Sequence, residues 1–374
     1  MALDTTWAAD AFEKIKEKIY VTCERIGDNI PYIPKDGSYL NHPVGLYWWT
    51  NGFWSGILWQ MYNATGEELY KKTAEAVEEK FDKLLEDFVG LHHDVGFQWL
   101  HTAVANYRLT ENNKSRARGL HAATLLAGRF NPVGRYIRAW NGDLTGYTII
   151  DTMMNIPLLY WASKELNDPR FEYIAKAHAD KTIEVTVRPD GSCNHICDLD
   201  PFTGDFKHNP GGQGFESGSS WSRGNAWALY GFALSYRHTN EARYLDTAKK
   251  IAHYFISNLA VNDWLPLVDF RAPKEPVKYD ATAAMIAACG LLEIARNVPE
   301  HEKALYENAA MRTLKACDNA FFNWDKTIDG IVYNGSSKYH TTENDADANT
   351  AIIYGDYFMI EAVLRILGKD FLIW

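Results

Sequence analysis

The feature that most constrains the fold of this chain is a helical period carried by two alternating kinds of segment. In the first kind, apolar residues such as Phe12, Ile15 and Ile19 recur at steps of three and four, with charged residues between them. Such a segment forms a helix with one buried face. The second kind is apolar on every side, as in NGFWSGILWQMY (51–62) and NAWALYGFALSY (225–236). A helix of this kind is buried all round.

The two kinds of segment alternate, so they form pairs. Amphipathic segments begin near residues 8, 66, 112, 168, 241 and 300, and apolar segments begin near 50, 94, 150, 222, 281 and 355. Six helical hairpins with the apolar helices inside predict an all-α fold, an (α/α)6 barrel, with residues 1–374 as a single catalytic domain. An open helical solenoid is the alternative, although solenoid repeats are shorter and more regular. Short β pieces are expected in the longer loops, for instance over 187–209.

Composition excludes several classes of function. The net charge is −10 and there is no Lys/Arg block, so we expect no nucleic-acid partner. The sequence contains no stretch of about 18 apolar residues, so we expect no membrane span. The N-terminal segment lacks the apolar core of a signal peptide. The five cysteines predict free thiols rather than a disulfide framework, and Cys193 and Cys197 have no second pair nearby to complete a zinc site. We therefore expect a cytoplasmic protein, either a monomer or a weak homo-oligomer.

The hairpin topology makes every apolar helix run in the same direction, so their N-termini open at one mouth of the barrel. Helix N-termini attract anions. Aromatic rings and carboxylates meet at this mouth, and sugar rings stack on Trp and Tyr, so the combination suggests a carbohydrate site. The residues collected there are Trp48, Trp49, Asn51, Asp94, Asp151, Trp221, Arg223, Asp280 and Asp356.

The motif HHDVGF (92–97) holds His92, His93 and Asp94. Neighbouring side chains on a helix diverge by about 100°, so we do not expect these three to share a metal ion. Asp94 could be a plain helix N-cap. Alternatively, it is a catalytic carboxylate or one that sets the pKa of another group.

Asp151 lies within the apolar run GYTIIDTMMNIPLL (146–159), with no basic residue within nine positions on either side. It is either a cap or a functional group, because burying a lone carboxylate costs several kcal/mol unless it is paired or protonated. Desolvation and a second carboxylate both raise the pKa of an aspartate. A protonated aspartate at neutral pH is what a general acid requires.

The stretch GGQGFESGSSWSRGNAW (211–227) carries Gln213, Trp221, Arg223 and Trp227 on a Gly/Ser loop that leads into an apolar helix. Arg223 is either a salt-bridge partner of the mouth carboxylates or a ligand for an anionic substrate group, whose carboxylate its planar fork would suit. The serines of this stretch fit no nucleophile motif, and the sequence contains no GxGxxG or Walker A pattern for a nucleotide cofactor.

Together these residues resemble the unsaturated glucuronyl hydrolases of glycoside hydrolase family 88. The resemblance covers most of the chain. It is carried by WTNGFWSGILW (49–59), HHDVGF (92–97), IIDTMMNIPLLYWA (149–162), GGQG (211–214), SSWSRGNAWALYGFAL (219–234), TAAMIAACGLLEIA (282–295) and GDYFMIEAVLRI (355–366).

The resemblance implies an (α/α)6 barrel that needs no metal or cofactor. It implies activity on Δ4,5-unsaturated uronic acids at the non-reducing ends of lyase-generated oligosaccharides, with hydration of the C4=C5 vinyl ether as the key step. It further implies that Asp151 is the general acid/base and Asp94 the second essential aspartate. The positions implied to contact substrate are Trp49, Trp140, His195, Gln213, Trp221, Arg223 and Trp227, with His93 and Tyr339 as wall residues.

One part of the chain departs from the family pattern. Ser336, Ser337 and Lys338, followed by Asp345 and Asp347, do not match the spacing of the Ser/Lys motif with which some relatives recognise sulfate. Three alternatives to a glucuronyl hydrolase stay open. They are an unsaturated rhamnogalacturonyl hydrolase of the same fold, an inverting glycosidase acting on saturated sugars, and a non-catalytic sugar-binding module.

Overall fold

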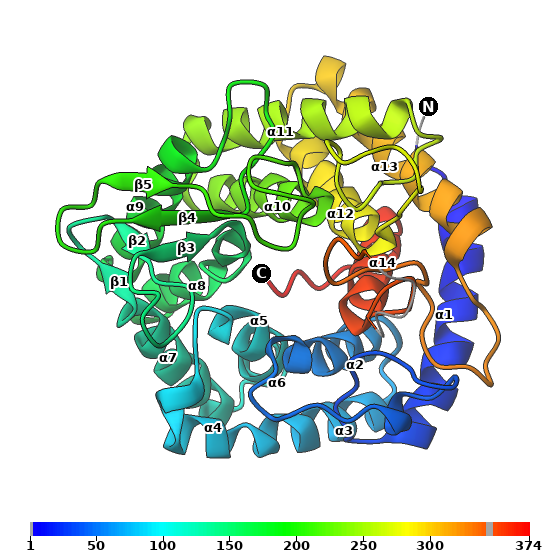
Figure 1. Cartoon of the computed structure of the whole chain (residues 1–374). Helices are drawn as coiled ribbons and strands as arrows, with labels where there is room; N and C mark the ends of the chain where they lie inside the picture. Colours follow the sequence, from blue (N-terminus) through cyan, green and yellow to red (C-terminus); the bar gives the residue numbers. More distant parts are fainter. Residues whose placement is uncertain (1–2, 342–346) are drawn as a thin grey trace.

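The computed structural model describes residues 3–341 and 347–374, so Asp345 lies outside the described residues. Amphipathic helices form an outer ring and apolar helices an inner ring (Figure 1). The outer helices are α1 (Thr5–Ile26), α3 (Glu68–Lys80), α7 (Asn113–Ala127), α9 (Arg170–Val185), α11 (Ala242–Ala260) and α13 (Glu300–Phe321). The inner helices are α2 (Gly52–Thr65), α5 (Val95–Trp99) with its continuation through η4 (Leu100–Val104) into α6 (Ala105–Thr110), α8 (Pro157–Leu166), α10 (Ser222–Thr239), α12 (Ala281–Asn297) and α14 (Ile353–Ile366).

The ring closes where the last inner helix meets the beginning of the chain. Helix α14 packs against α12 on one side and against α1 and α2 on the other. An open solenoid would leave its first and last repeats unpaired. The predicted (α/α)6 barrel is therefore confirmed, and the solenoid alternative is excluded.

Burial explains the two kinds of helix. Along α1, the buried residues Phe12, Ile15 and Ile19 form one face, and the Asp4 side chain caps the helix by accepting a hydrogen bond from the Trp7 amide at 3.0 Å. In α12, every residue from Ala281 to Ala295 is buried, as expected for a helix surrounded by protein.

The third inner segment departs from the prediction of a helix that begins near residue 150. Tyr147–Ile149 form strand β3, Ile150–Met154 form a short 3-10 turn (η5), and α8 begins only at Pro157. Proline fits the first turn of a helix because its missing N–H has no intrahelical partner there. Asp151 thus lies on a tight turn between a strand and a helix.

The β pieces expected over 187–209 are present and hold this turn in place. Strands β3, β4 (Ile196–Leu199) and β5 (Phe206–His208) form an antiparallel sheet in that order. The β3–β4 pairing continues into the turn, because the Ile150 amide donates to the His195 carbonyl at 3.1 Å. This pairing brings His195 beside Asp151. A separate hairpin joins β1 (Phe130–Asn131) to β2 (Tyr136–Ile137).

The C-terminal segment of the chain runs into the centre of the barrel (Figure 1). The indole of Trp374 stacks on Phe358 and donates a hydrogen bond to Glu361 at 2.8 Å. Arg365 forms ion pairs with Glu361 and Glu293, and all three charged side chains are fully buried. The five cysteines are buried and unpaired. None of the helices in the described part of the chain is both long and apolar enough to span a membrane.

Candidate active site

A cavity of about 330 Å³ opens at the end of the barrel where the inner helices begin. Its walls come from the segments that precede α2, α5, α8 and α10, from the first turn of α10 and from the loop before α14. Of the nine residues predicted at this mouth, Asn51, Asp280 and Asp356 are not among the described lining residues. The described lining residues are Tyr32, Tyr47, Trp48, Trp49, His92, His93, Asp94, Trp140, Ile149, Asp151, Gln213, Trp221, Arg223, Ser337, Lys338 and Asp347.

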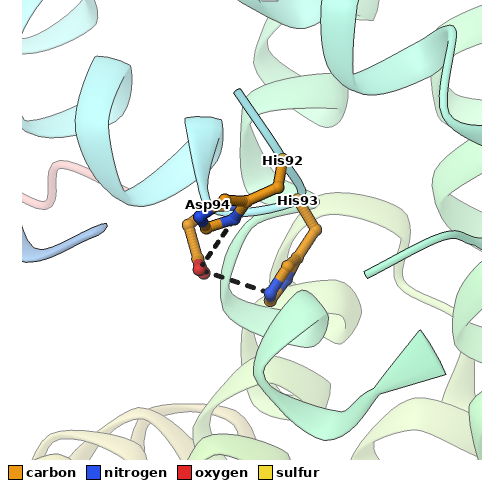
Figure 2. A group of neighbouring side chains, drawn as sticks. All are labelled: His92, His93 and Asp94. Carbon is orange, nitrogen blue, oxygen red and sulfur yellow. Dashed lines mark hydrogen bonds and ion pairs between the residues drawn. The ribbon is translucent and has the colours of Figure 1, made fainter. Parts of the chain in front are cut away.

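Asp94 lies in the turn just before α5, and its side chain makes no capping hydrogen bond to the described backbone. One carboxylate oxygen, Oδ1, accepts a hydrogen bond from the Asn155 amide at 3.1 Å. The other, Oδ2, lies 3.3 Å from both His92 Nδ1 and His93 Nε2 (Figure 2). The prediction that these three side chains diverge is wrong, because they precede the helix instead of lying on it.

The charge states of Asp94 and His93 follow from their surroundings. Burial opposes the charge on Asp94, yet His93, His92 and the Asn155 amide hold the pKa of its carboxyl below the usual value. Burial also lowers the pKa of His93 to about 4, because an imidazolium loses its hydration there. At neutral pH, Asp94 is therefore a carboxylate and His93 is a neutral imidazole.

Asp151 is buried on the η5 turn, and it too makes no capping hydrogen bond to the described backbone. Its Oδ1 has no hydrogen-bond partner among the described residues, and His195 Nε2 lies 3.6 Å from it. The cap interpretation is therefore wrong for Asp151 as it is for Asp94. Both carboxylates face the cavity instead of stabilising a helix end.

Asn155 joins the two aspartates. Its side-chain amide donates to Asp94 Oδ1 and to the main-chain carbonyl of Asp151, at 3.1 and 3.2 Å, and its Oδ1 accepts from the Phe97 amide at 2.7 Å. Gly96 makes this contact feasible, because a Cβ there would lie 2.4 Å from the Asn155 Cα. Asn155 was not predicted as a site residue, because its only signal in the sequence is an amide four residues after Asp151 in an apolar run.

His195 approaches Asp151 with a defined tautomer. Its Nδ1 accepts a hydrogen bond from the Gln213 amide at 2.9 Å, so its Nε2 carries the proton and faces Asp151. The ring packs against Trp221, with the ring centroids 4.5 Å apart. His195 therefore lies beside the cavity and contacts three of the residues that line it, Asp151, Gln213 and Trp221.

Arg223 is fully buried and forms an ion pair with Asp280 at 2.8 Å, which confirms the salt-bridge alternative. It also donates to the carbonyls of Ser336 and Ser337 and lies 4.5 Å from the centroid of the Trp221 ring. Burial alone would lower the pKa of the guanidinium, but Tyr354 and Asp280 raise it above its ordinary value. Arg223 thus fixes the loop that forms one wall of the cavity.

The remaining predicted residues divide into two groups. Trp49, Trp140, Gln213 and Trp221 line the cavity. Trp227 and Tyr339 are not among the described lining residues. Trp227 is fully buried below the cavity, with its ring 5.2 Å from that of Phe97, and Tyr339 lies behind Gln213, to whose carbonyl its amide donates at 2.6 Å.

The other lining residues were missed because they come from loops and from the end of the short strand β3, where the sequence has no periodic signal. Tyr32, Tyr47, Ile149 and Asp347 belong to this group. The Asp347 carboxylate accepts a hydrogen bond from the Ser337 hydroxyl, beside the exposed Lys338. This wall therefore presents both signs of charge.

Comparisons with known proteins place the chain in one family. The profile of glycosyl hydrolase family 88 matches residues 31–263. An unsaturated glucuronyl hydrolase from Bacillus sp. (strain GL1) is 37% identical over 355 residues, which cover 92% of each chain. An unsaturated chondroitin disaccharide hydrolase from Streptococcus pyogenes serotype M1 is 33% identical over 337 residues, 85% of this chain and 80% of that one. The crystal structure of an unsaturated glucuronyl hydrolase from Streptococcus agalactiae superposes with a TM-score of 0.92 at 27% identity, covering 100% of this chain and 95% of that one.

Proposed function

Because the chain belongs to glycosyl hydrolase family 88 and is a glycoside hydrolase, we propose that it removes Δ4,5-unsaturated glucuronic acid from the non-reducing end of glycosaminoglycan-type disaccharides. The observation that carries the proposal is the pair of unlike aspartates in one cavity. Asp94 is held ionised by its neighbours, whereas Asp151 presents an oxygen with no hydrogen-bond partner among the described residues. One carboxylate and one proton donor are the minimum set for hydrating a vinyl ether.

The chemistry follows from the bonding of the substrate. Its C4=C5 double bond adjoins the ring oxygen, so a proton delivered by Asp151 to C4 leaves positive charge shared by C5 and the ring oxygen. A water molecule then adds to C5 and returns its proton to Asp151, which acts first as acid and then as base. The resulting hemiketal opens to a ketone at C5. The hemiacetal thus exposed at C1 collapses to an aldehyde and releases the leaving saccharide.

Asp94 and His195 assist the two halves of this cycle. The negative charge of Asp94 stabilises the positive charge that develops at C5. The Nε2–H of His195, which faces Asp151, stabilises the Asp151 carboxylate after the proton has left. Cleavage at C1 follows from hydration, so the carboxylate-separation rule for retaining and inverting glycosidases does not apply.

The walls suit a short, anionic saccharide. Trp49, Trp140 and Trp221 offer faces for sugar rings. Arg223 and Lys338 line the cavity and carry positive charge, which attracts the negative carboxylate of the substrate. The volume of about 330 Å³ lies at the lower end of the range for small-molecule sites, which favours disaccharides over long chains.

We test the proposal by following the loss of the conjugated chromophore of lyase-generated chondroitin and hyaluronan disaccharides, with a rhamnogalacturonan disaccharide as comparison. Asp151→Asn should lose about 10²–10⁴-fold in rate, which is what a positioned proton donor contributes, while its circular dichroism stays that of the wild type. Heavy-oxygen water should label C5 of the keto product. Near wild-type turnover by Asp151→Asn, or release only from saturated aryl glycosides, would refute the assignment.

The full chain 1–374 is proposed to act as one catalytic domain, because the last inner helix completes the ring against α1. We further propose a cytoplasmic location. Support for it comes from the five unpaired cysteines, since thiols stay reduced in that compartment.

A further inference from the structure

His92, His93 and Asp94 direct three potential metal ligands at a common point (Figure 2). The ligand atoms of these side chains lie within 4.8 Å of one another, and Oδ2 of Asp94 lies 3.3 Å from a nitrogen of each histidine. In a tetrahedral zinc site, bonds of about 2.0–2.2 Å place neighbouring ligand atoms roughly 3.3 Å apart. The two separations that involve Oδ2 of Asp94 therefore already match those around a bound zinc ion.

The two histidine nitrogens of the cluster differ in what they contact. The backbone amide of Asp94 donates a long hydrogen bond to His92 Nδ1 at 3.5 Å, which a metal ion at that nitrogen would replace. His93 is 1% exposed, and its Nε2 has no hydrogen-bond partner among the described residues. Two nitrogens and one carboxylate oxygen thus face each other across a gap that a cation would fill.

A second layer of contacts fixes the orientation of the ligands. His93 Nδ1 is bonded to the Thr152 hydroxyl at 3.1 Å, and Asp94 Oδ1 accepts from Asn155. Metal-binding histidines characteristically use their second nitrogen in this way, and such contacts fix the ring and raise affinity. The side of the cluster that faces the cavity is left open for a fourth ligand, as in zinc sites with two histidines and one carboxylate.

We propose that His92, His93 and Asp94 form a reversible site for Zn²⁺ and that metal binding inhibits the enzyme by taking Oδ2 of Asp94 away from the substrate. The inhibition rests on the proposed function, whereas the binding site does not. Two imidazoles and one carboxylate suit zinc-class ions. Mg²⁺ and Ca²⁺ prefer oxygen ligands and should bind poorly here.

Binding is tested without substrate on the full chain after treatment with EDTA. Isothermal titration with ZnCl₂ should show one ion per chain, and Co²⁺ should give the visible absorption of a tetrahedral site. His92→Ala should weaken binding by at least about 10-fold, because loss of second-layer contacts alone costs 10–100-fold. Asp94→Asn should weaken it similarly. His121→Ala, which removes an exposed histidine of α7, is the control and should bind Zn²⁺ like the wild type.

Absence of one-site binding overturns the proposal. So does an affinity that His92→Ala and Asp94→Asn leave unchanged, because surface histidines would then account for the binding. Inhibition is measured separately: Zn²⁺ should raise KM, Mg²⁺ should not, and EDTA should restore the rate. Zn²⁺ bound at the cluster without any change in rate would refute the inhibition. If no unsaturated disaccharide is hydrolysed, the proposed function fails, while the titration still decides whether the site exists.

Discussion

Replacing Gly96 by alanine tests whether the two aspartates depend on the close contact between their segments. A Cβ at position 96 would lie 2.4 Å from both the Cα and the carbonyl oxygen of Asn155, and 2.7 Å from its Oδ1. Ordinary contacts of a Cβ begin at 3.4 Å, so the segments must separate by about 1 Å. Two of the obstructing atoms belong to the backbone, and no side-chain rotation can relieve the clash.

Gly96→Ala should affect the unfolding free energy and the rate to different extents. Overpacking of this kind costs about 1–3 kcal/mol of unfolding free energy. Asn155 holds Asp94 directly and Asp151 through its main chain, so the shift moves the catalytic pair. A misplacement of about 1 Å costs on the order of 10²-fold in rate. We therefore expect Gly96→Ala to fold, to lose about 1–3 kcal/mol in urea unfolding, and to lose about 10²-fold in kcat on an unsaturated chondroitin disaccharide.

Gly290→Ala is the matched control. A Cβ there would lie 3.0 Å from the Tyr230 Cα, so it also overpacks two inner helices. Position 290 is about 15 Å along α12 from Asp280, at about 1.5 Å per residue. This variant should lose stability with little change in kcat. If Gly96→Ala kept the wild-type kcat, or if both variants lost kcat equally, the inferred coupling between the two segments would be wrong.

Two further predictions concern charges outside the reaction. Burial raises the pKa of Asp356 to about 6. The stabilisation from the protonated Asp356 carboxyl is therefore fully present below 3.8, its pKa in the unfolded chain, and is lost as the pH rises through 6. Between pH 4 and 7, the unfolding free energy of Asp356→Asn relative to the wild type should therefore rise by up to about 3 kcal/mol in urea unfolding. A difference between the two proteins that does not change with pH would contradict the burial argument. Asp280→Ala leaves the buried Arg223 without its counter-charge and should cost about 3–5 kcal/mol. Asp180→Ala, in an exposed pair with Arg243, should cost less than about 1 kcal/mol, and equal losses in thermal unfolding would contradict this.

The fold was predictable because it depends on local periodicity. Each amphipathic or apolar segment specifies its own helix and buried face, and the parallel course of the inner helices brings Trp49, Asp94, Asp151 and Trp221 to one mouth without any knowledge of contacts. That much of the candidate site requires only the direction of the helices.

Several of the failures involve contacts between distant segments. Asp151 lies on a turn instead of a helix because β3 pairs with β4, some fifty residues further along the chain. The orientation of Asp94 depends on Asn155, which is 61 positions away. Trp227 has a side chain that could stack on a sugar ring, but it packs against Phe97 and Tyr354 instead. Periodicity contains no information about such contacts.

The amide of Asn155 has a consequence for how this enzyme can change. Because one small side chain ties both acids, neither can be moved alone, and substitutions near one acid will alter the effect of substitutions near the other. Variation that changes the preference for the departing sugar is then expected in the outer walls, around Tyr32, Lys338 and Asp347, whose side chains make no hydrogen bond to either aspartate in the described part of the chain.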